Sequence, residues 1–316
     1  MKGSKKKGKS KKLVQDDGGE LLIPIEHWSH SSLMAYLRNP LAWYKRYVEK
    51  IYDMPSNPSS IIGRAGHVAL QHFYQSRIVS GADARAHPLQ SDADCKGGAF
   101  SSGIGKEGAI DLGLEYLRSV PDFEINFGRA KSRRAQKDKR QSMEEDYLQA
   151  VSFYLARPPK HDVLGVEVAA KATVEGLALP IKAVSDLVVR SPVDPRAVDI
   201  VDHKFVNAFS THRGEKTLFV MQAIFNYYTV REKFGKPVRR FIVYECKKTK
   251  NADGSSQMRR YIVNFRDQKE AFTVFHRLIN DATAEISRRR LYLPNPSDMF
   301  EGENSFDIYR LGLLDG

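Results

Sequence analysis

The chain has 316 residues, of which 41% are hydrophobic and 28% charged, with two cysteines and a net charge of +12. This composition is typical of a globular protein, and because no apolar run approaches the roughly 20 residues that span a bilayer, we expect no membrane association. Two cysteines are too few for a disulfide framework or for an iron–sulfur site with four thiolates, and a lysine-rich start without an apolar segment predicts a cytoplasmic location.

A basic, disordered tail is predicted at the start of the chain, over residues 1–20. Seven lysines lie among the first twelve residues, and their +7 leaves only +5 of the net +12 for the rest of the chain. A solubilising arm and an arm in loose contact with phosphate groups both fit this pattern. The folded part is therefore expected to be only mildly basic.

Short helices are predicted directly after the tail. Ser31 or Ser32 is placed to cap a helix that ends before Pro40, and residues 41–52 continue as a second helical piece with aromatic anchors. Residues 61–74 have a helical spacing of apolar side chains.

A polar region follows these helices. Residues 81–109, rich in Gly, Ala, Ser and Asp, are expected to form a mobile loop. Residues 110–157 are predicted to form one or two helices, interrupted at residues 129–140 by a basic stretch with seven cations and one acid. This stretch fits either a solvated charged face or an arm that contacts phosphate groups.

The pattern changes from helical to strand-like at residue 163. Three consecutive strands are followed by a helix, two further strands and a final helix. The expected ranges are 163–170, 178–189, 197–205, 215–234, 238–247, 258–265 and 267–290. We therefore predict an α/β protein in which a helical N-terminal part, residues 21–160, accompanies a core at residues 161–316 with a mixed central sheet.

Three ionisable residues on the predicted strands indicate chemistry. Asp186 lies in an otherwise apolar strand, while Asp202 and Lys204, two residues apart, share one face of the next strand. If these strands pair with each other, the two aspartates approach. Adjacent carboxylates repel unless a cation lies between them, and oxygen ligands suit Mg²⁺ or Mn²⁺. Lys204 would then orient or deprotonate a water, or stabilise charge on a phosphate.

Companion motifs decide how this trio is interpreted, because an isolated Asp-x-Lys pattern is more often an exposed ion pair. Together the motifs resemble the PD-(D/E)xK nuclease superfamily in its RecB-like branch, which includes CRISPR-associated and phage exonucleases. The resembling segments are Trp28–Tyr36 with Asn39-Pro40, Gly63–His67, Val184–Asp186, Asp202–Lys204 and Met221–Tyr227.

The resemblance implies a centre for Mg²⁺ or Mn²⁺. His67, Asp186 and Asp202 would hold the ion, and the backbone carbonyl of His203 would be a further ligand. Lys204 would be the catalytic lysine.

Two further residues are implied by the same resemblance. Gln222 would support the catalytic site or contact the DNA. Glu167 is a candidate of second rank, at a place where related nucleases often carry an acidic residue.

The sequence departs from the family pattern in two places. The usual Gln-x-x-x-Tyr motif would place tyrosine where this chain has Asn226, so it stays open whether Tyr227 or Tyr228 has that role. Many relatives hold an iron–sulfur cluster with four cysteines, but the first of these positions is Asn39 and the tail at residues 293–306 has no cysteine. We expect no such cluster.

The implied fold is a restriction-endonuclease-like αβββαβ core with a helical N-terminal elaboration. The implied activity is metal-dependent hydrolysis of DNA, with an exonuclease favoured over an endonuclease, in replication, repair, recombination or phage DNA metabolism. The implied location is a bacterial or phage-infected cell. Single- or double-stranded DNA ends would be the substrate, and a second copy of the chain or a recombination protein would be the protein partner.

Two alternatives to an active nuclease remain. One is an accessory subunit with a nuclease fold that binds DNA without cutting it, although such a protein has no need of Lys204. The other is a nucleotide-binding enzyme, because residues 3–10 fit a P-loop pattern and residues 103–108 fit a dinucleotide-binding pattern. Neither pattern lies between a buried strand and a helix, as both motifs require.

Overall fold

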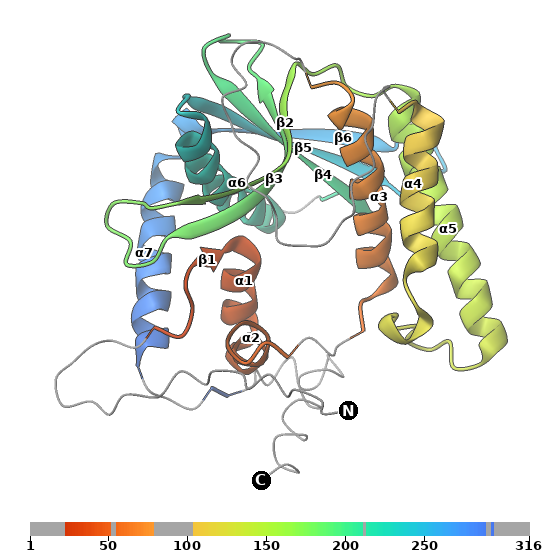
Figure 1. Ribbon diagram of the computed structural model, residues 1–316, viewed down its shortest axis with the longest axis horizontal. Coiled ribbons are helices and arrows are strands. Elements are labelled where there is room, and N and C mark those ends of the chain that lie inside the picture. The colour runs from red at the N-terminus through yellow and green to blue at the C-terminus, as the bar shows by residue number, and fades with distance from the viewer. Residues whose placement is uncertain (1–22, 52–54, 79–103, 211–212, 289–291, 294–316) are drawn as a thin grey trace, which may run out of the picture.

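The computed structural model describes residues 23–51, 55–78, 104–210, 213–288 and 292–293. A six-stranded mixed sheet lies at the centre, with helices on both of its faces (Figure 1). Three predicted segments lie wholly or mostly outside the described residues. They are the basic tail at residues 1–20, the mobile loop at residues 81–109 and the C-terminal segment at residues 293–306, which has no cysteine. Within the described residues, no helix is both long enough and apolar enough to cross a membrane.

The sheet has the strand order β1-β3-β4-β5-β6, with β2 paired to β3. The pairs β2–β3, β3–β4 and β5–β6 are antiparallel, whereas β1–β3 and β4–β5 are parallel. Helix α6 (Arg213–Phe234) connects the parallel strands β4 and β5, which confirms the predicted mixed α/β core. The strands are β1 (Trp28–Ser29), β2 (Val163–Ala172), β3 (Ile181–Arg190), β4 (Val198–Val206), β5 (Val238–Lys247) and β6 (Met258–Asn264).

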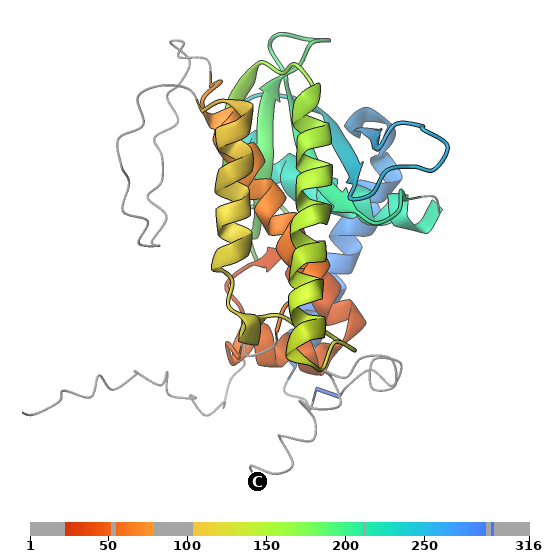
Figure 2. The same cartoon turned by 90° about the vertical axis from the view of Figure 1, so that its right-hand side faces the viewer.

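Two groups of helices sandwich the sheet. Helices α3 (Pro58–Gln75), α4 (Lys106–Ser119) and α5 (Arg133–Ala156) pack side by side and bury one apolar cluster against the sheet (Figure 2). Helix α6 and helix α7 (Lys269–Ser287), with α1 (His30–Arg38), bury the other clusters. The short elements are α2 (Pro40–Trp43), the π-helical turn η1 (Tyr44–Val48), and the 3₁₀ turns η2 (Asp122–Glu124) and η3 (Phe265–Asp267).

The N-terminal cap of α1 differs from the prediction. Ser29, rather than Ser31 or Ser32, caps the helix, because its side chain accepts a hydrogen bond from the backbone N–H of Ser32. Trp28 and Ser29 pair with β3 as strand β1, which holds the chain extended up to Ser29. The extended residue directly before the first turn is the one whose side chain can reach the free N–H groups.

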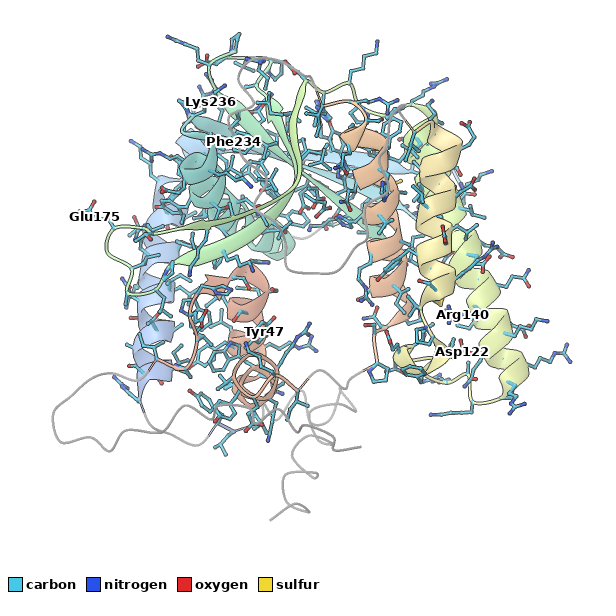
Figure 3. The ribbon with its side chains drawn as sticks, viewed as in Figure 1. Tyr47, Asp122, Arg140, Glu175, Phe234 and Lys236 are labelled. Carbon is cyan, nitrogen blue, oxygen red and sulfur yellow. The ribbon has the colours of Figure 1, made fainter. Side chains whose placement is uncertain are left out.

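The basic stretch and the predicted loop before it also differ from expectation. Residues 106–109 belong to α4, and the basic stretch does not interrupt a helix, because residues 133–140 of the stretch form the first turns of α5 after the cap residue Ser132. Arg140 pairs with Asp122 and donates to the carbonyl of Leu117, at the end of α4 (Figure 3). The other six cations of the stretch are exposed.

Gly66 in the middle of α3 allows that helix to lie close to β4. A Cβ atom at this position would lie 2.2 Å from Cε2 of the Phe205 ring on β4. Glycine costs about 1 kcal/mol in a helix interior relative to alanine, so close packing is its physical reason here. The contact also sets the position of the next residue, His67.

We expect Gly66→Ala to lower the free energy of unfolding by about 1–3 kcal/mol, because the added methyl group overpacks the Phe205 ring. Urea denaturation measures this change. Gly63→Ala is the matched control in the same helix, since its Cβ would meet nothing within 4 Å. Equal stability of the two variants would contradict this account of Gly66.

Candidate active site

A fork between β3 and β4 positions the predicted aspartates. The registered pairing of these strands runs from Arg190–Val198 to Leu187–Val201 and stops there. Asp186 and Asp202 are the next residue on each strand, so they lie on neighbouring strands at the point where the strands separate. Because β2 occupies one edge of β3 over its whole length, β1 and β4 share the other edge, and β1 pairs only at Ile181 and Lys182. The short gap between β1 and β4 therefore contains Asp186.

Asp186 replaces a missing strand partner at this fork. Its Oδ2 accepts a hydrogen bond of 2.6 Å from the backbone N–H of His203, which β3 would otherwise satisfy. The same oxygen lies 3.4 Å from Nδ1 of His67 on α3. Burial alone would raise the pKa of Asp186, but His67 and His203 outweigh it and hold the pKa at about 2. Asp186 is therefore an anion at neutral pH.

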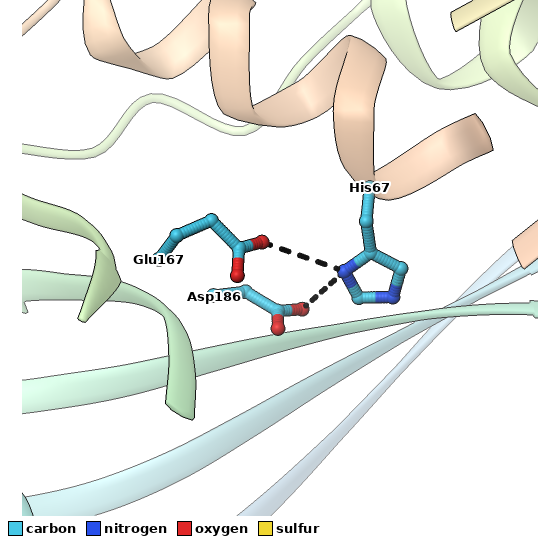
Figure 4. Close-up of side chains that lie close together, drawn as sticks. All are labelled: His67, Glu167 and Asp186. Carbon is cyan, nitrogen blue, oxygen red and sulfur yellow. Dashed lines mark ion pairs between the residues drawn. The ribbon is translucent and has the colours of Figure 1, made fainter. Parts of the chain in front are cut away.

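Glu167, on β2, completes a compact donor set with Asp186 and His67. The three residues each offer one ligand atom, and these atoms lie within 4.8 Å of one another (Figure 4). Two carboxylate oxygens and one imidazole nitrogen at this spacing fit a divalent cation. Glu167, the candidate of second rank, therefore lies in this cluster with His67 and Asp186, two of the residues expected to hold the metal.

Irregular backbone brings Glu167 and Asp186 to the α3 side of the sheet. Glu167 has a φ of +47°, in the left-handed region that few residues other than glycine adopt. Val166 packs with the α3 cluster while Val168, two residues later, packs with the α6 cluster, so the normal alternation of faces breaks between them. Bulges and strained residues of this kind concentrate at functional sites.

His67 is strongly coupled to the two carboxylates. Burial alone would lower the pKa of its imidazole, but the carboxylates of Asp186, 3.4 Å away, and Glu167, 3.8 Å away, raise it to about 9. Without a metal, the ring is therefore protonated at neutral pH and supplies the positive charge between the acids. A metal ion must displace that proton to bind His67.

In metal-free protein, we expect the stability contributed by His67 to fall as the pH rises. Its folded pKa of about 9 exceeds the ordinary value of 6.5, so the contribution is full below pH 6.5 and is lost as the pH rises through about 9. Urea unfolding of wild type and His67→Ala in EDTA across this range measures the effect. His72→Ala is the control on the same helix. A constant difference between wild type and His67→Ala at all these pH values would contradict the expectation.

Asp202 and Lys204 form a second cluster with Gln222 on α6. Lys204 Nζ lies 2.8 Å from Asp202 Oδ2 and donates a 3.0 Å hydrogen bond to Gln222 Oε1. Gln222 Nε2 donates a 2.6 Å hydrogen bond to the other Asp202 oxygen. The structure thus places Asp202 and Lys204 on one face, as the period of two predicts. Asp202 faces this cluster and is not one of the three residues of the donor set.

Charges in this second cluster shift the protonation of its members. Burial alone would lower the pKa of Lys204, but Asp202 outweighs it and raises the pKa, so the lysine remains a cation at neutral pH. Burial raises the pKa of Asp202, which Lys204 opposes and Asp186 reinforces. The two clusters are therefore electrostatically connected across the fork.

The side chain of His203 was not part of the prediction, which used only its backbone carbonyl. Its Nδ1 lies 3.3 Å from Asp186 Oδ2, and its Nε2 shares a 2.8 Å hydrogen bond with the hydroxyl of Tyr154 on α5. Tyr154 is hydrogen-bonded in turn to Tyr74 on α3, at 2.8 Å. This buried chain of hydrogen bonds orients the imidazole ring of His203 beside Asp186. No sequence motif connects the tyrosines to the site, because the contacts join residues distant in the chain.

Asn226 stands where the family pattern has tyrosine, and it supports the site from α6. It accepts a 2.6 Å hydrogen bond from the hydroxyl of Ser185 and donates one of 2.9 Å to the carbonyl of Gln222. Tyr227 packs against Phe265, and Tyr228 is hydrogen-bonded to His276 on α7. Among the described residues, neither tyrosine has a hydrogen bond or ring contact with a member of the two clusters.

Comparisons with known proteins found one family model and solved structures that are similar to this chain. A family model described as PD-(D/E)XK nuclease superfamily matches residues 27–298. Among solved structures, a candidate exonuclease from Eubacterium rectale has a TM-score of 0.47 and 11% identity, covering 93% of this chain and 100% of that chain. The structure of SSO0001 has a TM-score of 0.28 and 11% identity, covering 89% and 91%. No curated protein matches the sequence.

Proposed function

Because the chain belongs to the PD-(D/E)XK nuclease superfamily, we propose that it hydrolyses phosphodiester bonds of DNA with a divalent metal ion, Mg²⁺ or Mn²⁺. The observation that carries this proposal is the juxtaposition of the donor set His67, Glu167 and Asp186 with the Asp202–Lys204 pair at one fork in the sheet. Asp202 and the His203 carbonyl remain proposed as further ligands.

Each residue has a specific role in the proposed reaction. A bound divalent cation supplies Lewis-acid stabilisation of the scissile phosphate. Lys204, kept protonated by Asp202, donates to the charge that develops on the phosphate oxygens, and its raised pKa argues against a role as general base. Gln222 holds Lys204 and Asp202 in one geometry through its amide oxygen and nitrogen.

We propose exonuclease action on DNA ends as the finer form of this activity. Support comes from the resemblance of the N-terminal, Gly-x-x-x-His and Gln-centred motifs to RecB-like exonucleases. An accessory subunit that binds DNA without cutting is the weaker alternative, because the protein keeps Lys204 in a complete hydrogen-bonded cluster.

One experiment tests activity, substrate and mode together. End-labelled linear and circular DNA, single- and double-stranded, are incubated with the protein in Mg²⁺, Mn²⁺ or EDTA. We expect metal-dependent loss of linear DNA and survival of circular DNA. Cleavage of circles would overturn exonuclease action alone, and no cleavage of any substrate would overturn the proposed nuclease activity.

A further inference from the structure

The β2–β3 hairpin presents an exposed strip beside the donor set. On one face, Ala169 and Lys171 of β2 lie directly opposite Val184 and Lys182 of β3, and all four side chains are exposed. We call these four residues the two-lysine strip. The hairpin extends beyond the strip to a turn that contains Glu175 (Figure 3).

The strip lies on the same face as the carboxylates of the donor set. Ile181 and Ala183 pack with the cluster formed by α1, α6 and α7, and Ser185 is hydrogen-bonded to α6. Alternation along β3 therefore directs Lys182, Val184 and Asp186 to the opposite face, where His67 lies. The strip thus continues directly from the donor set along the strands.

The two lysines form an unfavourable arrangement for the folded protein alone. Lys171 and Lys182 are registered partners across the two strands, and like charges directly opposite each other are destabilising. Among the residues that the structure describes, neither has an ion pair with an acid. Burial lowers the pKa of the nearby His27, and so do Lys182 and Lys171, while Glu26 opposes them. The local potential is positive, and an anionic ligand would relieve the repulsion.

We propose that the two-lysine strip binds backbone phosphates of the DNA strand on one side of the scissile phosphate. This inference rests on the proposed function. Lys182 precedes Asp186 by four residues, so it lies about 13 Å along the strand from the carboxylate. The small side chains of Ala169 and Val184 lie between the lysines and the donor set, and they leave room for a nucleic-acid backbone. Lysine is suited to this task as a point charge for phosphate.

The first test measures DNA binding in EDTA, where no cleavage occurs. Fluorescence anisotropy with labelled single-stranded and double-stranded oligonucleotides is recorded at increasing salt for wild type and Lys171→Gln/Lys182→Gln. We expect the variant to bind about tenfold or more weakly at 0.1 M salt, with a salt slope shallower by about 1.4–1.8, as two lost phosphate contacts predict. The matched control, Lys250→Gln/Lys269→Gln, removes two exposed lysines elsewhere, one in the loop between β5 and β6 and one in α7, and should keep the wild-type slope.

The second test locates the phosphates. Oligonucleotides with a single uncharged methylphosphonate linkage, moved along the strand, are compared on wild type and the strip variant. At one or two positions on one side of the scissile phosphate, we expect the uncharged linkage to weaken binding by wild type but not by the strip variant. Such non-additivity indicates a direct contact between the lysines and that phosphate. The melting temperature of the strip variant should be unchanged or raised, because a like-charge pair has been removed.

The outcomes separate this inference from the proposed function. Wild-type affinity and salt slope in the strip variant would overturn the inference while leaving metal-dependent cleavage intact. The same anisotropy measurement with labelled polyglutamate tests an acidic protein partner instead. If the strip variant bound polyglutamate more weakly than wild type but bound DNA equally well, the inference would be overturned in favour of such a partner. Absence of metal-dependent cleavage by wild type would overturn the proposed function, and the binding data would be unaffected.

Discussion

Lys204→Ala is expected to lower the rate of DNA cleavage by about two to four orders of magnitude at saturating metal and DNA. In the structure, this ammonium group is the cation held against Asp202 by Gln222, beside the donor set. Its loss removes the donor that stabilises charge on the phosphate, whereas His67, Glu167 and Asp186 keep their arrangement. Single-turnover cleavage measures the rate, and calorimetry of Mn²⁺ without DNA should show nearly wild-type affinity.

A packing variant separates the lost charge from a folding defect. Asp202 is only 6% exposed, so removal of Lys204 leaves a buried acid without its cation. Lys204→Met keeps the apolar stem of the side chain, and Lys250→Ala removes an exposed cation from the loop between β5 and β6. We expect Lys204→Met to be as inactive as Lys204→Ala, and Lys250→Ala to be active. Wild-type cleavage by a folded Lys204→Met protein would rule out the proposed role of the lysine.

The part of the site that could be predicted depends on regular strand geometry. Asp202 and Lys204 share a face because side chains alternate with a period of two, and Asp186 and Asp202 lie on neighbouring strands because consecutive strands pair with each other. Strand β5 was predictable for a different reason. Its continuous apolar run is buried on both faces of the sheet, and it was predicted with the bounds that the structure has.

The part that could not be predicted depends on irregular backbone and on distant contacts. The left-handed conformation of Glu167 is imposed by the fold, because nothing in Gly165-Val-Glu-Val marks a residue with positive φ. Family resemblance indicated an acid there, but not that it would meet His67 and Asp186. The chain from His203 to Tyr154 and Tyr74 joins β4, α5 and α3, so only the packed structure brings these groups together.

Asp186→Asn is expected to weaken metal binding strongly while preserving the fork between β3 and β4. The asparagine keeps an oxygen that can accept the hydrogen bond from the His203 N–H, so the backbone contact persists. It loses the negative charge that a bound cation requires. That charge is also, next to burial, the largest influence on the pKa of His67. We expect Mn²⁺ affinity to fall by more than the roughly 10–100-fold that loss of an outer hydrogen-bond partner costs.

Two matched variants make this result specific to the charge at the fork. Asp186→Ala loses both the charge and the acceptor, so it should in addition be destabilised by about 1–3 kcal/mol, the cost of a buried N–H group left without a partner. Asp162→Asn removes an exposed carboxylate that pairs with Arg190 at the other end of β3, and it should bind Mn²⁺ like wild type. Because calorimetry without DNA reports binding alone, wild-type Mn²⁺ affinity in Asp186→Asn would show that the donor set is not the metal site, whatever the effect on cleavage.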